Sequence, residues 1–133
     1  AQAVGKHWEA QRHGAIVMTA STTVIAAGVG GAAGSGGPAY IASKAAITGL
    51  VRTMARALGP SSVRVNAVAP GVTETAMIRN YSPENRARAA ASAPLGRIGT
   101  PEEIADVACF LISHGARYMT GEVVIVNGGA NFG

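Results

Sequence analysis

The sequence predicts an α/β protein in which parallel strands are covered by helices. Short apolar runs alternate with longer stretches whose apolar residues recur at helical spacing. Glycine and proline stand at the ends of most of these segments, where turns are expected. A strand–helix–strand–helix–strand order is typical of a parallel sheet. The length of 133 residues suits one domain, so we expect residues 1–133 to form a single domain.

The first half of the chain is expected to hold two helices and one strand. Residues 1–13 have the pattern of an amphipathic helix, and we expect Gly14 to end it. The apolar run Ala15–Ala20 predicts a buried strand. Residues 21–37 are mostly Ser, Thr, Ala and Gly, which predicts a loop. A long helix is expected from Ala39 to about Leu58, between a proline before it and a Gly-Pro pair after it.

The second half is expected to add two strands with helices between them. Val63–Ala69 reads as a strand halted by a Pro-Gly turn, and residues 76–92 read as polar and helical, in one or two pieces. A helix is expected to start after Thr100, because Thr is a good N-cap and Glu103 completes a capping box. The last strand is expected at Glu122–Asn127, before two glycines.

Composition argues against several classes of protein. The net charge is +4, but the basic residues are scattered singly and aromatic residues are few, so we expect no nucleic-acid interface. No apolar run approaches the roughly 18 residues of a membrane span, so no membrane contact is expected. The single Cys109 excludes a disulfide scaffold and is expected to be a buried thiol. His7, His13 and His114 lack metal-ligand spacing, so no metal site is expected. A cytoplasmic location fits this cysteine usage.

Tyr40 and Lys44 form the pair with the clearest chemical meaning. Four positions apart on a helix, they share one face with Cβ atoms about 5–6 Å apart. A free phenol, with a pKa of about 10, is a poor acid–base group at neutral pH. A nearby ammonium group favours the phenolate and lets a phenol exchange a proton with an alcohol or carbonyl oxygen. The pair also follows a glycine-rich segment at a strand-to-helix crossover, where open parallel sheets bind ligands.

With these residues at its centre, the chain resembles the short-chain dehydrogenase/reductase family. The resemblance runs in order over residues 14–133 and covers the Tyr-x-x-x-Lys motif, the next strand with its Pro-Gly turn, the start of the last helix, and the final strand. The matching segments are Tyr40–Ala46, Arg64–Gly71, Glu74–Met77, Pro94–Ala105, Thr120-Gly121 and Val126–Gly129. The resemblance implies part of a doubly wound, Rossmann-like parallel sheet, namely its last three strands with their covering helices.

The family implies a nicotinamide-dependent oxidoreductase that acts on a small carbonyl or alcohol compound. Tyr40 would be the general acid/base, and Lys44 would bind the nicotinamide ribose. A serine after the preceding strand would hold the substrate oxygen, and Ser21 is the best candidate. Ser21 precedes Tyr40 by 19 positions, more than the family usually shows. The rival hydroxyls are Thr22, Thr23 and, more weakly, Ser35.

The same resemblance assigns cofactor contacts. The turn Pro70-Gly71-Val72-Thr73 would meet the nicotinamide of NAD or NADP, with a Thr73 backbone group on its carboxamide. Thr75 would approach the pyrophosphate, and residues 76–99 would cover the substrate. Asn127 stands where many members carry Asp, at little expected functional cost.

The front half of the family has no counterpart in the sequence. No Gly-rich strand–turn–helix is present to seat the pyrophosphate, and we interpret Gly28–Gly37 as a loop. The outer edge of Ala15–Ala20 would lack a neighbour, so we expect the chain to oligomerise, to aggregate or to dock on a missing N-terminal half. Small residues along Ala39–Leu58 permit close helix packing, and the resemblance implies a subunit interface at this helix, so we expect a homo-oligomer that pairs through it. The alternative hypothesis is a truncated, non-catalytic relative that acts as an oligomerising or binding module.

Overall fold

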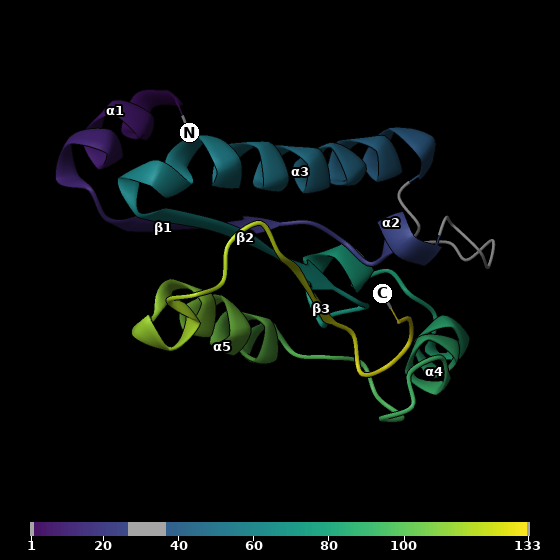
Figure 1. The fold of residues 1–133 in the computed structure, drawn as a ribbon. Helices are drawn as coiled ribbons and strands as arrows, with labels where there is room; N and C mark the ends of the chain where they lie inside the picture. Colours follow the sequence, from purple (N-terminus) through teal and green to yellow (C-terminus); the bar gives the residue numbers. More distant parts are fainter. Residues whose placement is uncertain (1, 27–36, 133) are drawn as a thin grey trace.

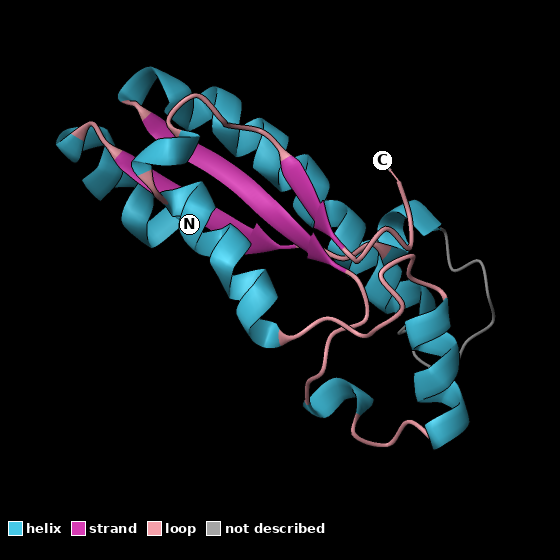
Figure 2. Cartoon of the chain, turned by 90° about the horizontal axis from the view of Figure 1, so that it is seen from below, coloured by secondary structure: helices cyan, strands magenta, loops and turns pink. Residues whose placement is uncertain are grey.

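A parallel sheet of three strands forms the centre of the protein. The computed structural model describes residues 2–26 and 37–132. Strands β1 (Gly14–Thr19), β2 (Val63–Pro70) and β3 (Val123–Val126) lie in the order β1-β2-β3. Both pairings are parallel, with Gly14 opposite Val63 and Ala67 opposite Val123. All three arrows in Figure 2 point the same way. The predicted α/β class with a parallel sheet is confirmed.

Helices cover both faces of this sheet. Figure 1 shows α1 and α3 on one face and α5 on the other. No helix in the described part of the chain is both long enough and apolar enough to cross a membrane. The helices are α1 (Gln2–Gln11), α2 (Thr23–Ala26), α3 (Gly37–Leu58), α4 (Pro83–Ala91) and α5 (Pro101–Ile112), with 3₁₀ turns η1 (Gly59–Ser61), η2 (Ala76–Ile78) and η3 (His114–Ala116).

The core follows from the two-residue alternation of β2. Alternate side chains of a strand point to opposite faces of its sheet. Val63, Val65, Ala67 and Ala69 are buried in the cluster that α3 completes with Val51, Ala55 and Leu58. Val68 is buried on the opposite face with Leu111 of α5 and Ala116. The strand is therefore covered on both faces, as the central strand of a parallel sheet should be, although its second face also carries the buried Asn66 and the partly buried Arg64.

Several predicted segments are confirmed, because their signals are local. The three strands appear within one or two residues of their expected bounds. Residues 76–92 form two helical pieces, and Ser82 caps the second by accepting a hydrogen bond from Asn85 N (3.2 Å). Thr100 and Glu103 form the expected capping box of α5. These features depend on neighbouring residues only, which the sequence displays directly.

Other predictions are wrong. Gly14 does not end the first helix: Arg12 adopts the left-handed conformation (φ 58°), and Gly14 begins β1. Helix α3 starts at Gly37, two residues earlier than expected. The predicted loop over residues 21–37 includes the short helix α2, and its residues 27–36 lie outside the described part. Cys109 is exposed, because α5 turns neighbouring positions toward the sheet.

Candidate active site

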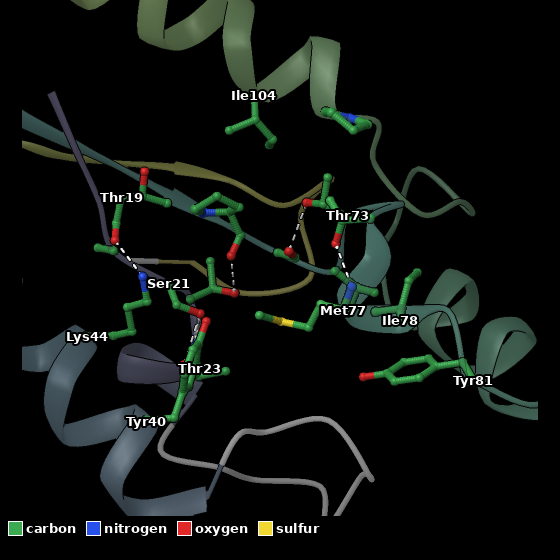
Figure 3. Close-up of a pocket in the computed structure, with 17 residues that line it drawn as sticks. Thr19, Ser21, Thr23, Tyr40, Lys44, Thr73, Met77, Ile78, Tyr81 and Ile104 are labelled. Atoms are coloured by element: carbon green, nitrogen blue, oxygen red, sulfur yellow. Dashed lines mark hydrogen bonds between the residues drawn. The ribbon is translucent and has the colours of Figure 1, made fainter.

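A cavity of about 390 Å³ lies at the carboxyl ends of β1 and β2. Its walls come from the segment after β1, the start of α3, the turn after β2, η2 and the start of α5 (Figure 3). The structure brings all the sequence-predicted site residues to this one cavity. They are Ser21, Tyr40, Lys44, Pro70, Gly71, Val72, Thr73 and Thr75. Their positions are thus observed, while their chemical roles stay predictions.

Tyr40 and Lys44 enter the cavity from the first turns of α3. Both side chains are half-buried. Lys44 Nζ donates a hydrogen bond to the backbone oxygen of Thr19 (2.9 Å), at the end of β1. The same nitrogen lies 5.7 Å from the centroid of the Tyr40 ring, within the range of a cation–π contact. The strand end therefore fixes the ammonium group beside the phenol, as the four-residue spacing predicted.

The hydroxyl groups after β1 differ in whether their protons are already donated to another residue. Thr22 Oγ1 donates to the backbone oxygen of Pro70 (3.2 Å), so this hydroxyl ties β1 to β2. Thr23 Oγ1 donates to Ser21 Oγ (3.0 Å), and Thr23 N donates to the same oxygen (3.3 Å). Ser21 thus accepts two hydrogen bonds and keeps its own proton to donate. Ser35, the weaker candidate, lies outside the described residues.

The turn after β2 approaches the end of β3 closely at Gly71. Gly71 N donates to the backbone oxygen of Val126 (2.9 Å). A Cβ atom at position 71 would lie 2.7 Å from Asn127 Cβ and 2.9 Å from Asn127 Cα. Only glycine fits such an approach without a shift of the backbone. The glycine of this Pro-Gly turn therefore sets how the turn enters the cavity.

Beyond Gly71 the chain is extended and its polar groups face two ways. Thr73 pairs with Gly99 in a parallel bridge, in which Gly99 N donates to Val72 O (3.1 Å) and Glu74 N donates to Gly99 O (2.9 Å). Backbone groups of successive residues in an extended segment point in opposite directions, so Thr73 keeps its own N–H and C=O on the side away from Gly99. Thr75 Oγ1 accepts a hydrogen bond from Met77 N (3.4 Å) and caps η2.

An apolar wall faces the hydroxyl groups, and its α5 members were not predicted. The sequence singled out residues 76–99 as a cover, which fits Met77, Ile78 and Tyr81, but Pro101 and Ile104 of α5 also line the cavity. Figure 3 shows Ile104 above the cavity and the Tyr81 side chain pointing into it. Nothing local distinguishes Ile104 from the other apolar residues of α5, because the packing of α5 on the sheet decides which of them reaches the cavity.

Two ion pairs connect segments near the cavity, but their side chains do not line the cavity. Arg86 donates to both oxygens of Glu74 (2.7 and 2.8 Å) and to the backbone oxygen of Ile78 (3.2 Å). Arg97 pairs with Glu103 (2.5 Å). The hydrogen bond from Arg97, followed by that from Thr100 N, lowers the pKa of Glu103 to about 2.

Metal-ligating side chains do not gather in the described ranges 2–26 and 37–132. No group of three or more His, Cys, Asp or Glu side chains there could hold a metal ion.

Comparisons with known proteins find similarity to oxidoreductases over nearly the whole chain. A family model described as enoyl-(acyl carrier protein) reductase matches residues 1–131. A 3alpha-hydroxysteroid dehydrogenase of Mediterraneibacter gnavus is 43% identical over 129 residues, which are 97% of this chain and 49% of that protein. The chain thus spans about half the length of the curated relatives it matches.

Solved structures agree with the sequence matches. A 4-hydroxyisoleucine dehydrogenase complexed with NADH has a TM-score of 0.87 and 31% identity, and the match covers 99% of this chain and 53% of that one. A gluconate 5-dehydrogenase from Burkholderia cenocepacia, in complex with NADP and tartrate, has a TM-score of 0.86 and 28% identity, over 98% of this chain and 49% of that one.

Proposed function

The chain belongs to the short-chain dehydrogenase/reductase family, and we propose that it forms the catalytic and substrate-binding half of a nicotinamide-dependent oxidoreductase that acts on a carbonyl or alcohol. One observation carries the proposal. Tyr40, Lys44 and Ser21 line a single cavity at the carboxyl ends of parallel strands, where open α/β sheets bind their ligands. It is supported by a relative named as a dehydrogenase and by two solved dehydrogenase structures that are complexed with NADP or NADH.

Tyr40 would transfer the proton. In the reductive direction its hydroxyl donates a proton to the carbonyl oxygen of the substrate, and in the oxidative direction the phenolate accepts a proton from the alcohol. The Lys44 ammonium group, held by its hydrogen bond to Thr19 O, lies beside the Tyr40 ring and thus close to the group that would transfer the proton. The nicotinamide, when bound, supplies or accepts the hydride at the carbon atom of the same substrate group.

Ser21 would hold the substrate oxygen. Its Oγ accepts two hydrogen bonds from Thr23 and keeps its proton for a third group. A substrate oxygen in the cavity is a suitable acceptor, because charge builds up on this oxygen during reduction. Thr22 is a weaker candidate than Ser21, since its hydroxyl already donates to Pro70 O.

The cavity lining fits the nicotinamide end of a cofactor. Thr73 offers one backbone donor and one acceptor, which match the carboxamide group. Val72 is 40% exposed and presents an apolar surface suited to an aromatic ring. Thr75 Oγ1 accepts from Met77 N and can donate its own proton to a phosphate oxygen. Both NAD and NADP share these parts, so either cofactor fits the proposal.

Replacement of Tyr40 by Phe tests the proton transfer. The Tyr40→Phe variant should lose turnover of NADH or NADPH with small ketones by about 10²–10⁴-fold, because the proton donor is gone. Its melting temperature should stay the same, since the ring remains. Tyr118→Phe is the matched control, because Tyr118 is fully exposed outside the cavity. Retained turnover in Tyr40→Phe would contradict the assignment.

Titration with NADH and NADPH, followed by fluorescence on a sample of known solution mass, separates the enzyme from the non-catalytic alternative. Binding of either cofactor supports the enzyme. A folded chain that binds neither cofactor would favour the oligomerising or binding module.

A further inference from the structure

The cavity has two chemically different sides. The side formed by the segment after β1 and the start of α3 carries the hydroxyl groups of Ser21, Thr23 and Tyr40 (Figure 3). The opposite side carries Met77 and Ile78 of η2, Tyr81 and Ile104. Figure 3 shows Met77 reaching across the cavity toward Ser21, with the Tyr81 hydroxyl directed inward. A substrate whose oxygen meets Ser21 and Tyr40 would therefore extend its remaining part toward the apolar side.

Charge is nearly absent from the described lining. Lys44 is the only charged side chain among the described residues that line the cavity, and its ammonium group already donates to Thr19 O. Arg86 and Arg97 lie outside this lining, and each is paired with a carboxylate, Arg86 with Glu74 and Arg97 with Glu103. A carboxylate or phosphate on the part of the substrate that lies at the apolar side, away from Lys44, would thus lose water contacts without gaining a cation, which is unfavourable.

We propose that this cavity selects uncharged carbonyl or alcohol compounds with an apolar body, and that Met77 and Tyr81 determine this selectivity. Burial of apolar substrate surface against Met77, Ile78 and Ile104 favours binding. Tyr81 adds a hydroxyl group that can donate a hydrogen bond to a second oxygen of the substrate. The proposal rests on the proposed function for the identity of the reacting group.

Two ketones of nearly equal shape test the selectivity. One is 4-isopropylcyclohexanone, and the other is 4-oxocyclohexane-1-carboxylate, in which a carboxylate replaces the isopropyl group. Binding to the full chain is followed by NMR of ¹³C-labelled methionine and isoleucine methyl groups, without a cofactor. Among the four methionines only Met77 lines the described cavity, while Met18, Met54 and Met119 pack in the core and serve as internal references.

The isopropyl ketone should shift the Met77 and Ile104 methyl signals and bind at least about 10-fold more tightly than the carboxylate. Met77→Lys should change the ratio of the two dissociation constants by about 10-fold in favour of the carboxylate, because it places a cation at the apolar side. Met77 is 72% exposed, so the lysine is compatible with the fold. Tyr118→Lys adds the same charge outside the cavity and should leave the preference unchanged.

Three results would overturn the proposal: tighter or equal binding of the carboxylate by the unsubstituted chain, equal effects of Met77→Lys and Tyr118→Lys, or no shift with either ketone up to its solubility limit. The Tyr40→Phe assay is independent of all three. Loss of the selectivity with intact Tyr40-dependent turnover would refute the substrate class alone. Selective binding without turnover would instead contradict the proposed oxidoreductase activity.

Discussion

At the level of single residues, position 71 requires glycine, and the effect of replacing this glycine can be measured. An added Cβ atom would lie 2.7 Å from Asn127 Cβ and 2.9 Å from Asn127 Cα, and the backbone atom cannot move aside cheaply. Gly71→Ala should therefore lower the free energy of unfolding by about 1–3 kcal/mol. It should also weaken NADH or NADPH binding, because the turn would leave the cavity. Chemical denaturation and cofactor titration measure the two effects.

Gly49→Ala is the control for this substitution. Gly49 is an exposed residue inside α3, and nothing lies within 4 Å of the Cβ that alanine would add. Alanine there should raise stability by about 0.5–1 kcal/mol, since it restricts the unfolded chain and favours helix. Equal effects of the two substitutions would show that contact with Asn127 is not the cause.

Glu103 makes the stability of the fold depend on pH at the acidic end. Its pKa falls from 4.5 to about 2, first through the hydrogen bond from Arg97 and then through Thr100 N. A carboxyl group with a lower pKa in the folded state stabilises the fold while it is ionised. This stabilisation is complete above the unfolded pKa near 4.5 and is lost as the pH falls through about 2.

Glu103→Gln should remove that part of the pH dependence. Between pH 4.5 and 2 the melting temperature of this variant should fall less than that of the unsubstituted chain. Glu84→Gln is a matched control, because Glu84 pairs with Arg88 at 3.2 Å on the open surface of α4. A pH profile that Glu84→Gln flattens as much as Glu103→Gln would contradict the role of Glu103.

At the scale of elements, the start of α5 links local sequence to the cavity. Thr100 accepts a hydrogen bond from Glu103 N, and Glu103 accepts one from Thr100 N (2.8 Å). This capping box fixes the first turn, which brings Pro101 and Ile104 to the cavity. Thr100→Ala should cost about 1 kcal/mol in the free energy of unfolding, because Glu103 N loses the hydroxyl that accepts its hydrogen bond.

Thr53→Ala provides the comparison for this cap. Thr53 is exposed in α3, and its hydroxyl only donates back to Gly49 O (2.9 Å). Its replacement should change stability by less than about 0.5 kcal/mol. Urea denaturation of both variants measures the difference. A similar loss of unfolding free energy for Thr53→Ala would mean that the capping box adds no more stability than an ordinary exposed threonine.

The elements that the sequence predicted poorly have non-local causes. Arg12, not Gly14, takes the left-handed conformation at the end of α1. Gly14 is needed instead for close packing, because an added Cβ there would lie 2.8 Å from the Trp8 ring. A glycine after a helical pattern suggests a helix end, but the sequence does not display which tertiary contact a glycine makes.

At the scale of the whole molecule, α3 has an outer face of small residues. Ala42, Ala46 and Gly49 are exposed there, and Leu50 is 51% exposed. Small side chains allow another helix to approach closely, so we expect the chain to self-associate through α3. Ala46→Arg should lower the solution mass measured by sedimentation, because a long charged side chain blocks the approach.

Ala87→Arg, on the exposed face of α4, is the control for this substitution. It makes the same chemical change on a different helix and should leave the mass unchanged. A mass that neither variant changes would place the contact elsewhere, for example at the outer edge of β1 or β3, each of which has one neighbour in the described sheet.

Local patterns in the sequence predicted the three strands and the longer helices, the parallel class of the sheet and the capping box at Thr100, and the spacing of four positions placed Tyr40 and Lys44 on one helix face. The other residues proposed for the chemistry came from the resemblance to the family. Tyr40 and Lys44 could therefore be recognised as a pair from their positions in the chain alone.

The fold determines which side chains share the cavity and which of their hydrogen-bonding groups remain available to a ligand. It distinguished Ser21, which keeps its proton, from Thr22, which donates to Pro70 O. It also brought Ile104 and Tyr81 to the cavity from segments more than 40 positions beyond Tyr40 and Ser21. The physical reason is that hydrogen bonds and packing between strand ends join distant parts of the chain, and no local pattern encodes these contacts.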